Sequence, residues 1–473
     1  MKLTLRNLGR LREATIDLDK DLILLTGPNN TSKTYVAHAI YGFGEEIFPI
    51  ATLALRRALE EFGAERPEAK ESLKIDLVEF FERYLTRVLD DCTREFREKL
   101  ADVLASSEEF VARTEVKLEL SKEHLLWLKQ SLVSLEESKT IQSLGLMTRK
   151  VAGEPVWTFE RLPSPTSVLG ASGSSTPSSN GVEPFAGAYI ATMAVFVKWV
   201  LPFFAHIHVL TAERAAIQLF SRELSLKRTE LVDELLKLKS SPRADAGHAI
   251  GEMLEQRAQR YPLAIRDSLR IANDLTSYKA SSSSFAPLAD LLERGLLGGS
   301  IRVDEHGEML FHPNESDTRL SLHLASSSVK SLAGLSFYLR HIAEKGQFLI
   351  IDEPELNLHP DNQRRVARVL ARLVRSGVKV LISTHSDYII RELNNLIMLS
   401  ANKDGSVRQR LGYDEAETLS PSQVGAYLFD PERANPIEVT PTGIEVATID
   451  REINALNTVS QDIFFSLFGS TGT

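Results

Sequence analysis

The hydrophobic positions at the start of the chain alternate with polar ones and then close into a short apolar run. Residues 3–8 alternate like a half-buried strand, and residues 11–19 can pair with them as a second strand. The run at 22–25 is typical of a strand buried on both faces, and it ends at Gly27. Because helical periodicity begins near Lys33, we predict three strands followed by a helix.

A second group of buried strands is predicted far along the chain. The apolar runs at 348–351 and 378–382 suit strands that are covered on both faces. Between them, residues 362–376 carry apolar side chains at helical spacing, and Gly377 follows as a helix end. This pattern predicts a strand–helix–strand unit.

The middle of the chain has mainly helical periodicity. We predict helix over 53–104 with a break at 63–67, a strand over 111–120, helix over 122–138, 185–239 and 248–279, and a mobile Ser-, Pro- and Gly-rich loop over 163–184. The fold class is therefore α/β, with one nucleotide-binding domain split by a mainly helical insertion. The expected boundaries are 1–50 and 300–400 for the domain, 51–299 for the insertion and 401–473 for a C-terminal extension.

Composition narrows the class of protein. The 473 residues suffice for two or three domains, and a net charge of −9 argues against a general attraction to nucleic acid. The single cysteine, Cys92, excludes an intramolecular disulfide or a CxxC metal site and fits a reducing cytosol. The most apolar stretch, 190–210, is interrupted by polar residues, so we expect a buried helix there and a cytoplasmic protein without a membrane span.

The residues Gly27 to Thr34 match a phosphate-binding loop between a strand and a helix. Such a loop offers backbone N–H groups, a lysine (Lys33) for the β- and γ-phosphates and a hydroxyl (Thr34) for Mg²⁺. Ser32 stands where the pattern has glycine, and it would cost roughly 1–2 kcal/mol if it adopts a positive φ. A polar turn that caps a helix through Asn30 or Thr31 is the alternative.

Three further motifs carry polar groups. Asp352 and Glu353 end the run at 348–351, where a metal ligand and a base for the attacking water are needed. His385 ends the next strand and is a candidate contact for the γ-phosphate; a hydrogen-bonded histidine at a strand end is the alternative. Ser326–Lys330 opens a helix, either as a simple cap or as a donor of N–H and O–H groups to phosphate.

The order of these motifs resembles the ABC-type ATPases of the SMC, Rad50, RecF and OLD group. It is most similar to the OLD-like (AAA15/AAA21-type) ATPases of antiphage defence, such as those of the PARIS and Septu systems. The resemblance covers about residues 1–50 and 300–400 and implies a P-loop ATPase head with a mixed sheet. The insertion is too interrupted for the long coiled coil of SMC or Rad50.

The resemblance also implies roles for single residues. Glu353 and His385 match catalytic positions, Thr34 and Asp352 match metal ligands, and Asn357 and His359 fall in the D-loop. The ATP-binding set is Gly27, Asn29, Asn30, Thr31, Ser32, Lys33, Thr34, Ser327, Ser328 and Lys330. The last three lie in the signature region, where the usual Ser-Gly-Gly is absent. Arg214 resembles a recurring element of the OLD-like group, which implies a role facing the active site; pairing with Glu213 or capping at a helix start is the alternative.

The expected function follows from the same resemblance. ATP and Mg²⁺ are the expected cofactors, and a homodimer or higher homo-oligomer is expected because the signature of one copy completes the site of another. No Asp-x-Asp occurs after residue 400, so a Toprim nuclease is expected as a separate polypeptide. We expect a defence ATPase that answers a phage-encoded trigger and controls a Toprim- or HNH-type effector. A RecF-like repair ATPase that binds DNA is the alternative, and a transport subunit is disfavoured.

Overall fold

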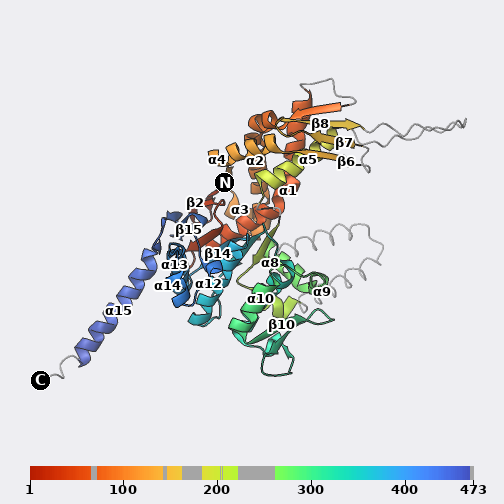
Figure 1. Ribbon diagram of the computed structural model, residues 1–473. Helices are drawn as coiled ribbons and strands as arrows, with labels where there is room; N and C mark the ends of the chain where they lie inside the picture. The colour runs from red at the N-terminus through yellow and green to blue at the C-terminus, as the bar shows by residue number, and fades with distance from the viewer. Residues whose placement is uncertain are drawn as a thin grey trace, which may run out of the picture. The chain divides into compact units, whose positions relative to one another are not determined.

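The computed structural model describes residues 1–64, 72–141, 146–161, 184–202, 204, 206–221 and 261–468. These residues form two compact units (Figure 1). Unit 1 comprises Met1–Leu3, Phe43–Glu98 and Val116–Ala205, and unit 2 comprises Thr4–Gly42, Lys99–Glu115 and His206–Thr473. The segment expected to be an insertion, 51–299, therefore contributes residues to both units.

A mixed β-sheet forms the centre of unit 2. Its strands include β1 (Lys2–Leu8), β2 (Leu11–Asp17), β3 (Leu22–Thr26), β9 (Ile207–Leu210), β13 (Phe348–Asp352), β14 (Lys379–Thr384), β15 (Val424–Phe429) and β16 (Arg433–Ile437). They lie in the order β1-β2-β16-β15-β3-β14-β13-β9. The pairs from β15 to β9 are parallel, whereas β15 and β16 are antiparallel. All residues of β3, β13 and β14 are buried, which explains their continuous apolar runs.

Helices cover this sheet and bury its apolar side chains. Those that share its hydrophobic core are α9 (Leu275–Lys279), α10 (Ala286–Leu292), α11 (Ser327–Phe337), α12 (Pro360–Arg375) and α13 (Asp387–Ser400). Unit 2 also contains α8 (Leu263–Asn273), α14 (Ser406–Arg410) and α15 (Ala447–Phe468), and α1 (Lys33–Ala64) begins in it. Leu349 of β13, Val380 of β14 and Leu370 of α12 belong to one hydrophobic core. A small sheet of β10 (Gly299–Val303), β11 (Met309–Pro313) and β12 (Leu320–Ser321) lies beside them in the same unit.

The stretch 190–210 does not form the single buried helix that its composition predicted. Helix α5 (Pro184–Val195) and a π-helical turn (Phe196–Val200) occupy its first part, but strand β9 begins at Ile207. The strand forms because Ile207 to Leu210 pair with Phe348 to Ile351 of β13, a partner that lies far away in the sequence. Among the described helices, none has the length and apolar content that a bilayer crossing requires.

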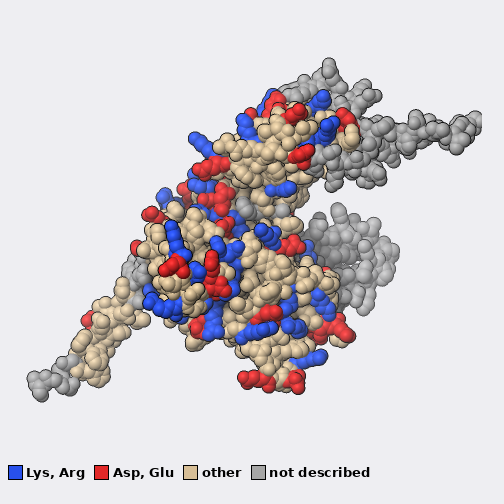
Figure 2. All heavy atoms as spheres, viewed as in Figure 1, with Lys and Arg blue, Asp and Glu red and all other residues tan. Residues whose placement is uncertain are grey.

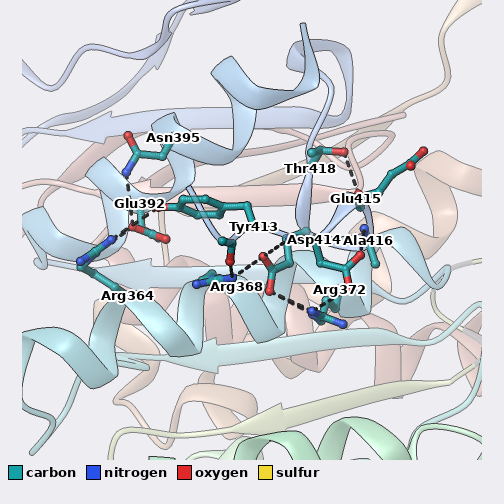
Figure 3. Close-up of polar contacts among 12 residues, drawn as sticks. Arg364, Arg368, Arg372, Glu392, Asn395, Tyr413, Asp414, Glu415, Ala416 and Thr418 are labelled. Atoms are coloured by element: carbon teal, nitrogen blue, oxygen red, sulfur yellow. Dashed lines mark hydrogen bonds and ion pairs between the residues drawn. The ribbon is translucent and has the colours of Figure 1, made fainter. Parts of the chain in front are cut away.

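Residues after 400 also build part of the sheet, through β15 and β16, although the sequence pattern set them apart as an extension. Arginines of α12 form ion pairs with the segment that leads to these strands (Figure 3). Arg368 and Arg372 both bind the buried carboxylate of Glu417, at 2.7 and 3.1 Å, and Arg372 also binds Asp414 at 3.2 Å. Ion pairs with a buried partner hold this segment against the head.

Unit 1 combines helices with a second sheet. Its elements include α2 (Leu77–Leu104), α4 (Lys122–Ser134) and the strands β4 (Ser72–Asp76), β6 (Glu137–Ile141), β7 (Leu146–Lys150) and β8 (Val156–Arg161), in the order β4-β8-β7-β6. The four-stranded sheet was not predicted. It ends the helix expected over 122–138 at Ser134, because Glu137–Ile141 pairs with β7.

Two other predicted elements differ in extent. The strand expected over 111–120 is β5 (Glu115–Glu119), since Val111 closes the short helix α3 (Glu108–Val111) that Ser107 caps. The helix expected over 53–104 is divided between α1 and α2 by β4. The loop predicted over 163–184, apart from Pro184, and the predicted helical residues 222–239 and 248–260 lie outside the described residues.

Candidate functional site

The loop from Gly27 to Thr34 connects the buried end of β3 to the start of α1. Gly27, Asn30 and Ser32 have φ values of 133°, 62° and 69°, so the loop turns through the left-handed region. A Cβ on Gly27 would lie 2.3 Å from the carbonyl oxygen of Phe429, and glycine is therefore required there. Ser32 adopts the positive φ that the sequence pattern assigns to glycine, at a cost of roughly 1–2 kcal/mol.

Lys33 is buried and folds back over this loop. Its Nζ donates hydrogen bonds to the carbonyl oxygens of Gly27 (3.1 Å) and Pro28 (2.7 Å) and to Oγ1 of Thr31 (3.1 Å). Burial lowers the pKa of Lys33 to about 8, and the nearby charge of Asp352 works in the opposite direction. Neutral carbonyl acceptors can be replaced by phosphate oxygens, which form stronger, charge-assisted bonds with an ammonium group.

Asp352 links the loop to the ends of β13 and β14. Thr34 Oγ1 donates to Asp352 Oδ2 at 3.0 Å, and the Ser383 hydroxyl donates to the other oxygen, Oδ1. A hydroxyl beside a carboxylate offers the oxygen ligands that Mg²⁺ prefers, with phosphate and water as the remaining ligands. Within the described ranges no group of three or more His, Cys, Asp or Glu residues is placed to hold a metal. No role for Ser383 was predicted from the sequence.

Glu353 and His385 lie next to each other at the same edge. Their side chains are 34% and 31% exposed, with His385 Nε2 4.0 Å from Glu353 Oε1. Glu353 has a φ of 49°, a strained conformation held by a bond from its N–H to the Ser383 carbonyl (3.0 Å). Burial and the charges of Asp352 and Glu355 raise the pKa of Glu353, whereas burial and Lys33 lower the pKa of His385. At neutral pH the histidine is therefore uncharged.

Glu355 positions the peptide that carries His385, a role the sequence pattern did not reveal. Its Oε1 accepts hydrogen bonds from Thr384 Oγ1 and from the backbone N–H of His385, both at 2.7 Å. Its Oε2 is buried and has no partner within the described structure. Burial raises the pKa of this carboxyl group, and the two donated bonds counteract the shift.

Arg214 binds the backbone of the site through hydrogen bonds to carbonyl oxygens. The buried guanidinium donates to the carbonyl oxygens of Ser331 (2.9 Å), Asp352 (2.8 Å) and Glu353 (2.7 Å), and of Thr211 (3.1 Å). Of the two sequence interpretations, the geometry favours the residue that faces the site, because these acceptors include the carbonyls of the acidic pair. Arg214 thereby connects α11 with the end of β13.

The signature-like segment stands apart from these contacts. Ser326 caps α11 by accepting from the Val329 N–H, and its hydroxyl lies 2.9 Å from that of Ser328. Across the described chain, no hydrogen bond joins Ser327, Ser328 or Lys330 to the residues of the Gly27–Thr34 loop. The D-loop residues are near α11 and α12: Asn357 Nδ2 donates to Ser331 Oγ at 3.1 Å, and His359 caps α12.

A protein-family model matches most of the chain. The AAA_15 model, described as an AAA ATPase domain, matches residues 1–390. A segment of 80 residues is 32% identical to the cell division ATP-binding protein FtsE of Streptococcus pneumoniae, in strains D39 and R6. This segment is 16% of the chain and spans only 34% of FtsE.

Among solved structures, two SMC head domains are similar over nearly the whole chain. That of Pyrococcus furiosus, bound to the C-terminal domain of ScpA, aligns with a TM-score of 0.32 at 10% identity and covers 97% of this chain and 98% of that one. That of Thermotoga maritima gives 0.31 and 12%, with coverage of 93% and 98%. Scores this low do not establish a shared fold.

Proposed function

Because the chain belongs to the AAA_15 family of AAA ATPase domains, we propose that it binds ATP with Mg²⁺ and hydrolyses it slowly. The observation that carries the proposal is the 3.0 Å hydrogen bond from Thr34 Oγ1 to Asp352 Oδ2. It places the hydroxyl of the phosphate loop beside the carboxylate of the second motif, as a shared Mg²⁺ site requires. Two separate polar turns have no reason to meet in this way.

The other site residues have distinct proposed roles. The loop N–H groups and Lys33 bind the phosphates, and Mg²⁺ held by Thr34 and Asp352 neutralises their charge. Glu353 orients the attacking water and accepts its proton, for which it must be ionised. His385, neutral and beside Glu353, donates to the γ-phosphate. Ser327, Ser328 and Lys330 of a second copy complete the site, so turnover requires association of at least two heads.

Replacement of Glu353 by glutamine tests this assignment. Glu353→Gln keeps the shape of the side chain and removes the base, so ATP binding is retained while turnover falls by roughly 10²–10⁴-fold. Asp361→Asn is the matched control, because it removes an exposed carboxylate at the start of α12 that forms an ion pair with Arg365. Turnover of Glu353→Gln equal to that of the control would contradict the assignment.

At the level of the cell, the proposed role is that of an ATP-dependent sensor and scaffold in antiphage defence. A separate nuclease of the Toprim or HNH type would be its effector, and a phage protein its trigger. Two observations support this role: residues 424–437 complete the ATPase sheet instead of forming a nuclease, and acidic and basic side chains are interspersed over the visible surface (Figure 2). A pull-down from the native host should recover the nuclease; DNA binding that depends on ATP at low salt would favour a repair ATPase instead.

A further inference from the structure

The last helix, α15, exposes an apolar surface along its described side chains. Every residue from 454 to 468 is exposed, and the helix appears in Figure 2 almost without charged atoms. Four apolar residues recur at intervals of three or four and so share one face: Leu456, Val459, Ile463 and Leu467, here called the α15 stripe. Their exposures lie between 53% and 67%. Phe464 and Phe465 widen the apolar surface beyond this face, at 57% and 66%.

Such a helix requires a partner. In proteins most helical stability comes from packing of an apolar face against other elements, and soluble proteins rarely leave large apolar surfaces open. The two phenylalanines expose on the order of 200 Å², since an aromatic side chain covers roughly 150–250 Å². The four stripe residues add on the order of 300 Å², at roughly 60–120 Å² each. Together these come to about 500 Å², within the roughly 300–600 Å² of the largest apolar patch on a typical monomer, which is often a binding surface.

We propose that α15 is an association surface between copies of this chain, with the α15 stripe packed against the same helix of a second copy. Charged residues beside a helical seam normally select the partner, but Asp462 is the only charged residue from 454 to 468. An identical helix therefore meets almost no electrostatic repulsion. A membrane surface is a poorer partner, because helices that bind membranes carry lysine and arginine on their polar face.

The root of α15 is fixed to the ATPase head. Strand β18 (Gly443–Ile444) precedes the helix, and Asn394 of α13 holds it by two hydrogen bonds, to the Ile444 carbonyl (2.9 Å) and from the Ile444 N–H (2.7 Å). Helix α13 begins at Asp387, two residues after His385. Pairing of α15 would therefore keep two heads close together. The inference does not depend on ATP hydrolysis.

Mass measurement in solution tests the proposal, with the full chain carrying Lys33→Ala so that nucleotide cannot join the heads. We expect an oligomer at micromolar concentration without nucleotide. Ile463→Glu in the α15 stripe should reduce the mass to that of one chain. Gln461→Glu is the matched control, because position 461 is two residues from Val459 and from Ile463 and so lies on the opposite side of the helix. A monomeric parent, or an oligomer unaffected by Ile463→Glu, would overturn the proposal.

Cross-linking gives a second measurement that does not depend on stability. Cys92 is the only cysteine; it is buried, and burial raises the pKa of its thiol to about 12, so it hardly reacts. With diamide as the oxidant, Val459→Cys should give a disulfide-linked dimer in high yield and Gln461→Cys little. Equal yields from the two positions, or association seen only when another host protein is present, would contradict a homotypic interface.

Discussion

The end of β3 and the helix α15 belong to the same unit but differ in how far their side chains find partners within the chain. At the end of β3, Lys33, Thr34 and Asp352 already have partners within the chain, and strained residues hold them in place. Along α15, large apolar side chains are more than half exposed. The candidate nucleotide site is therefore held together by contacts within one chain, whereas the proposed association uses an apolar surface that is still exposed. The two properties should therefore be separable by mutation.

The largest effect is expected from Lys33→Ala. The change removes the ammonium group that would bind the phosphates, so ATP affinity should fall by roughly 10²-fold or more, since each bond to a charged group contributes about 1.5–3 kcal/mol. Association through α15 should not change. Isothermal titration with ATP and mass measurement without nucleotide check the two statements. A parallel loss of both properties would show that the two regions are coupled and not separable.

A smaller effect on ATP affinity is expected from a rise in pH. Lys33 must be charged to bind phosphate, and its pKa of about 8 means that the charge is complete well below this pH and is lost above it. ATP affinity should therefore decrease by up to about tenfold per unit as pH rises beyond 8, with uptake of one proton on binding. Calorimetry in buffers of different ionisation enthalpy measures this proton. Association through α15, which involves one carboxylate, should stay constant over the same range.

The smallest effect is expected from Ser32→Gly. Glycine adopts the φ of 69° without strain, so the bound conformation of the loop should be stabilised by roughly 1 kcal/mol. ATP turnover should then rise several-fold. Asn30→Gly is the matched control: Asn30 has a similar φ of 62°, but asparagine tolerates the left-handed region and should gain less. Steady-state turnover of the two variants decides the question. An unchanged rate in Ser32→Gly would argue that Ser32 does not slow the enzyme.

The central strands and the elements that flank the phosphate loop were predictable because their signals are local. Continuous apolar runs mark β3, β13 and β14, and helical spacing followed by Gly377 marks α12. Strand β9 was hidden because a short apolar segment is compatible with a helix or a strand, and its pairing with Phe348–Ile351 decides between them. The sheet positions of β15 and β16 depend in the same way on distant partners.

The supporting residues of the site were harder to predict than the candidate ligands. Thr34 and Asp352 occur in recognisable motifs, but Arg214 binds backbone carbonyls, which every residue possesses and which leave no mark in the sequence. Ser383 and Glu355 lie two residues from His385 and Glu353 in the sequence. Their hydrogen-bond partners are defined only when β13 and β14 lie side by side. The roles of these residues became visible through their three-dimensional contacts.

The close approach of Gly27 to the backbone of Phe429 has a consequence for the synthesis of the protein. Leu22 of β3 pairs with Val380 and Val424, which are synthesised several hundred residues later. At roughly 5–20 residues per second, about 400 intervening residues take on the order of 20–80 s. During this time the phosphate loop lacks both neighbouring strands. A nascent chain, or one that ends before β15, would therefore lack backbone that packs against the phosphate loop and would not form the proposed nucleotide site.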